Sequence, residues 1–274
     1  WTLSSPGTVA TNRPTRLPQP GSNPEFDKAK AEARPLSAGP LTMLVAALSW
    51  FLTPAVGQGL IAAEPAPPAA TATVTTQPTP WQNLFAGETL NGWKTIGYAG
   101  AGEITVEDGS IFLGMGAMLT GLSYTNPLPK INYEVTLKAM RIDGSDFFCG
   151  LTFPVQDSFC TLIAGGWGGG LVGLSSLDNY DASENETSTY RNFERKRWYS
   201  FRLRVTQARI EAWLDGDPLI DVSIADRKIS LRPGEIEMSV PFGISAWQTR
   251  AALRDIRLRT LDPAEIPAAP AAKP

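Results

Sequence analysis

Histidine is absent from the sequence, which has 274 residues. This absence excludes catalysis by a Ser-His-Asp or Cys-His arrangement, and it excludes zinc, copper or iron held by imidazole. Any bound metal would need oxygen ligands, as calcium and magnesium do. Cysteine is scarce as well, with Cys149 and Cys160 as its two copies. Because two cysteines form one bridge at most, a scaffold stapled by several disulfides is excluded.

A strong charge of either sign is also lacking. The formal net charge is −3. The chain therefore lacks the excess of basic residues that nucleic-acid binding requires, and we expect no nucleic-acid partner.

Long hydrophobic runs are lacking too, because the apolar stretch at residues 41–56 is interrupted at Pro54. It is short for a membrane span and follows a few basic residues, a pattern typical of the apolar part of a signal peptide. Residues 41–63 would then hold this part and its cleavage region. The alternative is an uncleaved membrane anchor over the same residues. In both cases we expect the remainder to be exported to the periplasm, the cell surface or the medium, with membrane contact through this segment alone.

Proline and small residues divide the chain into a folded part and its flanks. Residues 1–40 are predicted to be a disordered N-terminal segment, 64–80 an extended Pro/Ala/Thr linker, and 263–274 a disordered tail. The interval 81–262 is then the one folded domain.

The clearest structural pattern lies at residues 197–222. Tyr199, Phe201, Leu203 and Val205 alternate with polar residues, as expected for a strand with one buried face. Two more short alternating runs follow, and the second begins after the turn dipeptide Asp215-Gly216. These residues predict a three-stranded antiparallel meander that forms one wall of a β-sandwich.

Similar patterns elsewhere bring the total to about a dozen strands, with no convincing helix. The further predicted strands are 103–107, 110–113, 131–142, 147–153, 158–164, 171–175, 242–247 and 251–259. The glycine-rich segment 165–170 is predicted to be too flexible for a strand, and 177–188 to be an acidic loop. The fold class is therefore all-β, a two-sheet antiparallel sandwich of the jelly-roll kind.

Four segments together carry a resemblance to a known family. Residues 84–93 read LFAGETLNGW and residues 106–109 read VEDG; the meander contains an alternating strand followed by WLDG, and 242–258 contain FGI and ALRDIRL. In combination these resemble the 3-keto-disaccharide hydrolase domain family over residues 81–261. The resemblance implies a concanavalin A-like or laminin-G-like jelly roll. It also implies cleavage of glycosides whose sugar carries a ketone at C3, where a base removes the C2 proton and the C1 substituent leaves.

The middle of the domain differs from the usual family pattern. Residues 145–153 and 159–165 lack the Arg, Glu and Gln that line the concave sheet in relatives, so the chain resembles a divergent member. Two alternatives to an enzyme therefore stay open: a non-catalytic carbohydrate-binding module and a purely structural surface domain. For the enzyme and the binding module, the expected partner is a carbohydrate.

Aromatic residues outside the regular strands are the candidate sugar contacts. Trp167 lies between glycines and could stack on the C–H face of a sugar or fold back onto the sheet edge. Trp247, with Gln248 beside it at a strand end, is the second candidate, and core packing is its alternative. Trp93, Trp198 and Trp213 match the structural tryptophans of the family, so we interpret them as packing residues.

The acidic loop concentrates oxygen donors. Asp181, Glu184 and Glu186 in this loop, together with Asp146, are the candidates for the catalytic base, and Arg191 could stabilise an oxyanion. The same loop could instead bind calcium, although it lacks EF-hand spacing, or be a solvated acidic turn. We expect no metal and no cofactor, with calcium as the alternative.

Cys149 and Cys160 lie on the two arms of one predicted hairpin around residues 154–157. If Phe153 opposes Ser158, the cysteines are diagonal neighbours near the limit for a disulfide, and a shift of two residues would place them directly opposite. Buried free thiols that face the core are the favoured interpretation, with a disulfide as the alternative.

Overall fold

The structure is a computed structural model that describes residues 79–266. The predicted N-terminal segment, the apolar segment 41–63, most of the linker and the end of the tail lie outside these residues. Within 79–266, no helix has the length and apolar character needed to cross a bilayer.

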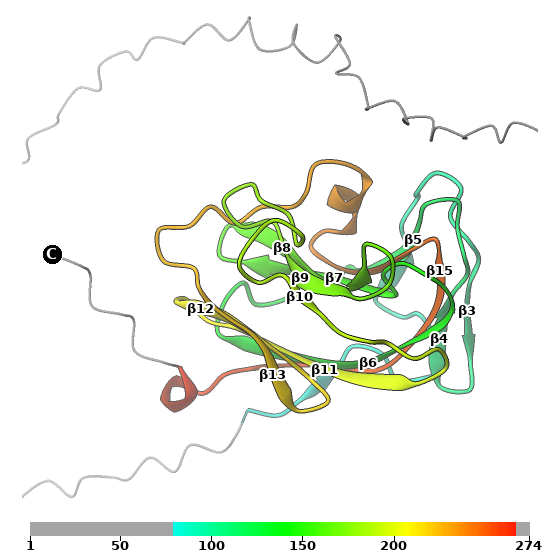
Figure 1. Cartoon of the computed structure of the whole chain (residues 1–274). Helices are drawn as coiled ribbons and strands as arrows, with labels where there is room; N and C mark the ends of the chain where they lie inside the picture. The colour runs from blue at the N-terminus through cyan, green and yellow to red at the C-terminus, as the bar shows by residue number, and fades with distance from the viewer. Residues whose placement is uncertain (1–78, 267–274) are drawn as a thin grey trace, which may run out of the picture. The chain divides into compact units, whose positions relative to one another are not determined.

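Two antiparallel sheets lie face to face (Figure 1). The eight-stranded sheet runs in the order β13 (Asp217–Ser223), β12 (Arg209–Leu214), β11 (Trp198–Val205), β6 (Tyr133–Gly144), β15 (Thr249–Thr260), β4 (Ser110–Leu113) and β3 (Ile104–Glu107), with β1 (Gln82–Asn83) paired to β15. The seven-stranded sheet runs in the order β10 (Thr189–Tyr190), β9 (Leu171–Ser175), β8 (Ser158–Gly166), β7 (Cys149–Val155), β14 (Phe242–Trp247), β5 (Leu119–Tyr124) and β2 (Trp93–Thr95). The predicted fold class, an antiparallel β-sandwich, is confirmed.

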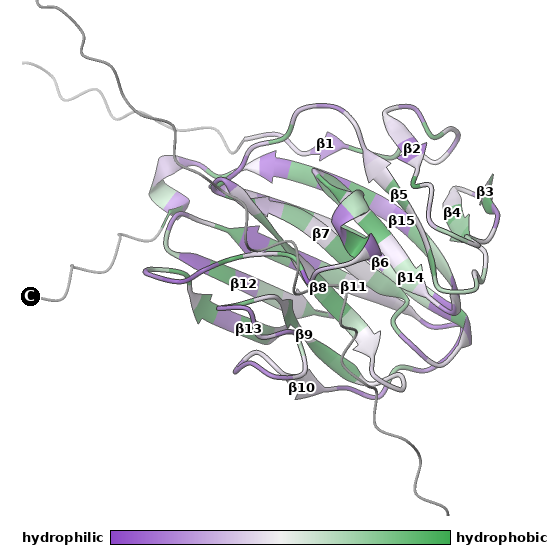
Figure 2. Cartoon of the chain, turned by 90° about the horizontal axis from the view of Figure 1, so that it is seen from above, coloured by the Kyte–Doolittle hydropathy of each residue, from purple (hydrophilic) through white to green (hydrophobic). Residues whose placement is uncertain are grey.

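The predicted meander is present as β11, β12 and β13. Along β11 the side chains of Tyr199, Phe201, Leu203 and Val205 are buried, while the residues between them are partly or fully exposed. Figure 2 shows the same alternation as green and purple bands along β12 and β13. Asp215 and Gly216 both have positive φ, which is the requirement of the tight hairpin turn that joins β12 to β13.

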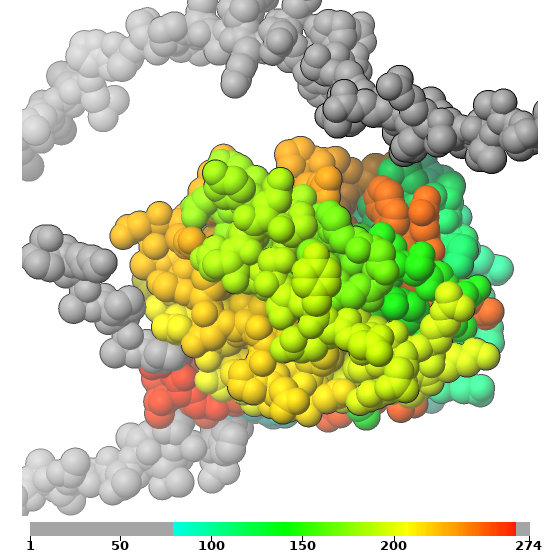
Figure 3. All heavy atoms as spheres, in the orientation of Figure 1, coloured from blue at the N-terminus to red at the C-terminus, as the bar shows by residue number. Residues whose placement is uncertain are grey.

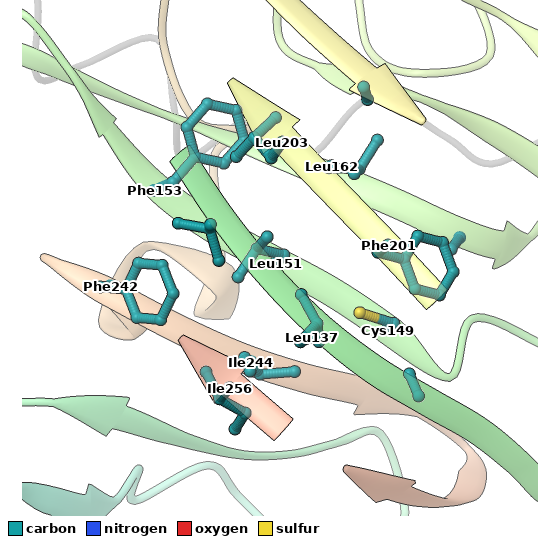
Figure 4. Packing of buried hydrophobic residues seen from close by; sticks show 14 of the residues in the cluster. Leu137, Cys149, Leu151, Phe153, Leu162, Phe201, Leu203, Phe242, Ile244 and Ile256 are labelled. Carbon is teal, nitrogen blue, oxygen red and sulfur yellow. The ribbon is translucent and has the colours of Figure 1, made fainter. Parts of the chain in front are cut away.

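The core fills the space between the two sheets. Leu137 and Leu203 from one sheet and Leu151 and Phe242 from the other are fully buried or nearly so, and Figure 4 shows them in one continuous cluster. Each such side chain contributes roughly 1.5–3 kcal/mol when it is removed from water. This shared apolar layer holds the two sheets together.

The strand register of the β7–β8 hairpin differs from the one assumed in the sequence analysis, in which Phe153 opposes Ser158. Val155, rather than Phe153, opposes Ser158, so Cys160 opposes Phe153 and Cys149 opposes Ala164. The cysteines are therefore offset by four residues, roughly 13 Å along a strand, which is too far for a disulfide. Both are buried free thiols in the core, as favoured from the sequence, and Figure 4 shows Cys149 there.

Several boundaries differ from the sequence-based predictions. The turn of this hairpin is shorter than predicted, because Pro154 and Val155 belong to β7. β8 continues through Gly165 and Gly166, where a bulge in its pairing with β9 accommodates the glycines. Strands β1, β2, β5 and β10 were missed: three are very short, and β5 is buried on both faces and does not alternate.

Two short 3-10 helices also occur, where no helix was predicted. The first, η1 (Glu235–Ser239), lies between β13 and β14, and the second, η2 (Pro263–Glu265), follows β15. Glu265 forms a salt bridge with Arg259 at 2.7 Å. The folded part therefore includes the first residues of the predicted tail.

Candidate functional site

The outward face of the seven-stranded sheet carries unusually small residues. Gly121 and Gly243 lie on β5 and β14, and a Cβ atom at Gly243 would come within 2.4 Å of the carbonyl oxygen of Ser239. A side chain is therefore excluded there, because η1 packs directly on the backbone of the strand. Figure 1 shows η1, in orange, above this sheet.

Buried hydroxyl groups link η1 to the strands beneath it. Ser239 donates to Thr152 at 2.7 Å, and Thr152 shares a hydrogen bond of 2.9 Å with Thr161. Tyr98 and Ser245 form another such bond at 3.0 Å. Burial raises the pKa of Tyr98, so its phenol stays protonated over the usual pH range. The network runs from η1 to Thr161 on β8, where it reaches the lining of a hollow.

At that end the structure has a hollow of about 420 Å³, which we call the front hollow. Three parts of the chain form its wall: residues of the seven-stranded sheet, the loop around Trp167, and the segment that leads into η1. Its lining residues are Met118, Leu119, Asp146, Phe147, Thr161, Ile163, Trp167, Ser175, Arg232, Pro233, Gly234, Glu235, Ile236 and Trp247. In Figure 3, orange atoms of the segment after β13 lie beside green atoms of the seven-stranded sheet on this side of the molecule.

Two of the predicted aromatic contacts meet at the front hollow. Trp167 is 41% exposed, in a turn where its own φ is +45°. Trp247 is half-buried and packs against Phe147, with 6.4 Å between their ring centroids. Trp167 is thus partly open to solvent at the hollow, whereas Trp247 is half-buried in its wall. Gln248 does not line the hollow; it is exposed, and its side-chain amide donates to the carbonyl of Ala117 at 2.9 Å.

The charged residues of the front hollow come mainly from a turn that the sequence analysis treated only as a loop. Arg232 lies over Trp167, with 5.6 Å from its guanidinium carbon to the ring centroid. Glu235 begins η1, and its Oε2 atom is buried without a hydrogen-bond donor among residues 79–266. Buried carboxylate oxygens normally have a hydrogen-bond donor, so the unpartnered Oε2 of this lining residue makes Glu235 a candidate functional group. Its signal in the sequence is an Arg and a Glu on either side of Pro233-Gly234.

Asp146 is the one predicted base that lines the front hollow. Its Oδ1 accepts a hydrogen bond from the backbone N–H of Phe147 at 2.7 Å, which leaves the second carboxylate oxygen open. Arg141 positions the backbone here: its Nη2 donates to the carbonyls of Asp146, Gly165 and Gly169 at 3.1, 3.0 and 2.8 Å. Burial lowers the pKa of Arg141. One buried guanidinium therefore joins the segments that carry Asp146 and Trp167.

The acidic loop lies beside the front hollow and does not line it. Glu186 forms an ion pair with Arg227, and this hydrogen bond lowers the pKa of Glu186, which makes its carboxylate a weak base. Asp181 reaches the site only through Arg232, whose Nη1 lies 3.2 Å from Asp181 Oδ2. Glu184 is exposed and outside the lining.

Arg191 lies away from these carboxylates. Its Nη1 donates to Thr189 at 3.2 Å and to the carbonyl of Tyr190 at 2.9 Å. Over residues 79–266, no three Cys, Asp or Glu side chains come together in a way that suits a metal ion.

Comparison with known proteins identifies the family. Residues 80–259 match the 3-keto-alpha-glucoside-1,2-lyase-like domain. The chain belongs to this family. The resemblance found in the sequence is thereby confirmed, and the lyase-like domain coincides with the β-sandwich described above. No curated protein matches the chain.

Three solved structures illustrate what the lyase-like domain is similar to in fold. A proposed glycosyl hydrolase from Parabacteroides distasonis has 14% identity and a TM-score of 0.43, covering 66% of this chain and 94% of its own. The carbohydrate-binding module CBM66 from Bacillus subtilis has 16% identity and a TM-score of 0.44, covering 62% and 96%. The Crh5 transglycosylase in complex with NAG has 10% identity and a TM-score of 0.47, covering 69% and 89%.

Proposed function

We propose that the lyase-like domain binds a saccharide in the front hollow and cleaves glycosides whose sugar carries a ketone at C3. The observation that carries the proposal is the lining of this hollow, which combines a partly exposed tryptophan, an arginine and the two acidic residues Asp146 and Glu235. We further propose that it acts outside the cytoplasm, because the apolar run at residues 41–56 has the pattern of an export signal.

The ketone determines which groups the reaction needs. A carbonyl at C3 acidifies the C2–H bond, so a carboxylate can remove this proton. The electron pair then forms a C2=C3 bond, and negative charge develops on the C3 oxygen. We assign proton removal to Glu235 and stabilisation of this oxyanion to Arg232, which both line the front hollow.

The second half of the reaction expels the leaving group. The enolate re-forms the C3 carbonyl, a C1=C2 double bond appears, and the bond between C1 and the glycosidic oxygen breaks. That oxygen takes a proton from Glu235, which was protonated in the first step, or from Asp146. Addition of water across the double bond, with oxygen at C1 and a proton at C2, then gives the hydrolysed sugar.

The test compares Glu235→Gln with Glu184→Gln in the full chain. Turnover of a 3-keto disaccharide is followed by release of its C1 substituent, and binding is measured by calorimetry. We expect Glu235→Gln to lower kcat by about 10²–10⁴-fold with little change in Kd, because a general base contributes about this factor. Glu184→Gln should behave as the parent, since Glu184 is exposed outside the hollow. Equal turnover of the parent and Glu235→Gln would disprove the assigned base.

One observation favours a second candidate function, that of a non-catalytic carbohydrate-binding module. The outward face of the sheet carries glycines and hydroxyls covered by η1, and Asp146 already accepts a backbone hydrogen bond. Under this alternative, the parent protein would bind neutral saccharides and leave the 3-keto disaccharide intact. Trp167→Ala would still weaken binding, whereas Glu235→Gln would have no effect.

A further inference from the structure

The eight-stranded sheet also has an outward face, and its register concentrates positive charge there. Trp213 opposes Arg202, Arg202 opposes Thr136, and Thr136 opposes Arg257 across β12, β11, β6 and β15. These four residues form one row across the sheet. Two arginines thus flank a short threonine, which leaves space between them.

The neighbouring rows are largely neutralised. Glu134 is buried and pairs with Arg204 at 2.7 Å and with Arg259 at 2.6 Å. On the other side, Lys138 pairs with Asp255 at 2.9 Å. Asp255 also lies 4.0 Å from Arg254, so this row keeps part of its positive charge. The row between the two holds the larger excess, because it has two arginines and no acidic residue.

Arg202 and Arg257 carry this excess. The Nε of Arg202 lies 3.7 Å from Glu134, which already binds two other arginines. Arg257 is exposed and forms no salt bridge with any residue in the described part of the chain. An anionic group between these two guanidinium groups would find charge-assisted donors on both sides. Lys138 and Asp255, which pair with each other, line the same surface.

The row borders a second hollow of about 440 Å³, which we call the rear hollow. Trp81 and Trp213 are among its walls, together with Thr136, Arg202 and Arg257. The guanidinium carbon of Arg202 lies 3.7 Å from the ring centroid of Trp213, so the indole holds this guanidinium in place. Trp81 is 40% exposed and directly precedes β1, which pairs with β15. It therefore provides an apolar surface on the β15 side of the hollow. Trp213, interpreted from the sequence as a packing residue, is half-buried and packs on Arg202 at this outer face.

We propose that the rear hollow binds an acidic saccharide, with a carboxylate or sulfate between Arg202 and Arg257 and sugar C–H groups against the tryptophans. The two guanidinium groups supply the charge-assisted donors, and the indoles select for a ring with an apolar face. The rear hollow is on the opposite sheet from the front hollow, and the two share no lining residue. This site gives the domain a way to hold an acidic polysaccharide while the front hollow acts on another part of a glycan.

The experiment measures binding of an oligogalacturonide trimer to the full chain by calorimetry, beside a trimer whose carboxylates have been reduced to alcohols. We expect the acidic trimer to bind and the reduced trimer to bind at least about tenfold more weakly, because it lacks the charge-assisted hydrogen bonds. Arg257→Gln should weaken binding of the acidic trimer by about tenfold, and higher salt should weaken it further. Arg250→Gln is the matched control: this arginine is also exposed on β15 but does not line the hollow.

Further measurements separate this site from its alternatives. Trp167→Ala, which changes the front hollow, should leave binding of the acidic trimer unchanged, so failure of the proposed glycosidase activity does not affect this test. Equal binding of the reduced trimer would overturn the proposal, as would an equal loss in Arg250→Gln. Displacement by inorganic sulfate at the same concentration as the trimer would show an anion site without sugar recognition. Tighter binding of a single-stranded oligonucleotide would identify a nucleic-acid surface instead, and both results would contradict the proposal.

Discussion

Arg232 and Asp181 form an ion pair of 3.2 Å at the edge of the front hollow. Asp181 also accepts a hydrogen bond of 2.6 Å from the Ser183 hydroxyl, so its own loop fixes the carboxylate. The paired Arg232 then lies over Trp167. Asp181, which the sequence suggested as a catalytic base, holds the arginine without lining the hollow itself, so in the proposed mechanism we assign it a positioning role.

Asp181→Asn tests this positioning role. Loss of the charge frees the Arg232 side chain, so we expect kcat/KM for a 3-keto disaccharide to fall by roughly tenfold, about 1.4 kcal/mol of transition-state stabilisation. The pH dependence of kcat should stay that of the parent, because the catalytic base is unchanged. Asp178→Asn is the control, since Asp178 pairs with Arg227 outside the hollow. A shifted pH profile in Asp181→Asn would identify Asp181 as the base.

Trp167→Ala should weaken saccharide binding in the front hollow by about tenfold, as expected for loss of one aromatic stacking contact. The melting temperature should stay the same, because the side chain is 41% exposed. Tyr190→Ala provides the comparison, since Tyr190 is an exposed aromatic residue outside the lining. Calorimetric titration of both variants measures the difference. Equal affinity of Trp167→Ala and the parent would place the sugar elsewhere.

The fold was largely predictable because most strands bury one face. Alternation along β11 and the turn at Asp215-Gly216 are local signals, and both predict the observed meander. β5 lacks such a signal: η1 and other segments cover its outer face, so all of its residues are buried. The register of β7 and β8 was missed because the turn begins at Gln156, whose φ is +55°, and Pro154 reads as a turn residue although it lies in the strand.

The site was less predictable, because its charged residues come together through tertiary contacts. Trp167 stood out beside glycines, and Asp146 was among the candidate bases. Arg232 and Glu235 belong to a segment whose place over the sheet depends on backbone pairing between Ser176 and Ser230, at 2.6 Å from N to O. No local pattern encodes this pairing. Composition favoured the acidic loop instead, although its carboxylates are largely paired with arginines.

Arg141→Met should destabilise the protein by roughly 2–4 kcal/mol, because charged hydrogen bonds to buried carbonyls are lost. Arg141 is buried, and its Nη2 contacts the carbonyls of Asp146, Gly165 and Gly169. Thermal unfolding followed by circular dichroism measures the change. Arg195→Met is the matched control, since Arg195 is exposed and should tolerate the substitution. A similar melting temperature for both variants would mean that the carbonyls find other donors.

Leu203→Asp should be severely destabilising, by about 4 kcal/mol or more, because it places an unpaired charge in the core. Leu203 is 1% exposed on β11, and Val135 of β6 and Ala212 of β12 lie opposite it. Ser223→Asp on β13 introduces the same charge at an exposed position, and we expect a change within about 0.5 kcal/mol. Urea unfolding of the two variants gives the comparison, and equal midpoints would contradict the assigned inward face.

The buried thiols predict how stability depends on pH. Burial raises the pKa of Cys149 and Cys160 from an ordinary value near 9 to about 12. Well below pH 9 both thiols are protonated in the folded and unfolded states, so they contribute no pH dependence. Between about pH 9 and pH 12 only the unfolded state releases these protons, so stability falls by roughly 1.4 kcal/mol for each thiol and pH unit.

A variant with Cys149→Ala and Cys160→Ala should lose this part of the decline in urea unfolding, although its stability at pH 7 will be lower. The native parent should also resist a thiol reagent at pH 8 and react at both cysteines in denaturant. An equal alkaline decline in the variant, or rapid labelling of the native parent, would contradict two inaccessible, neutral thiols.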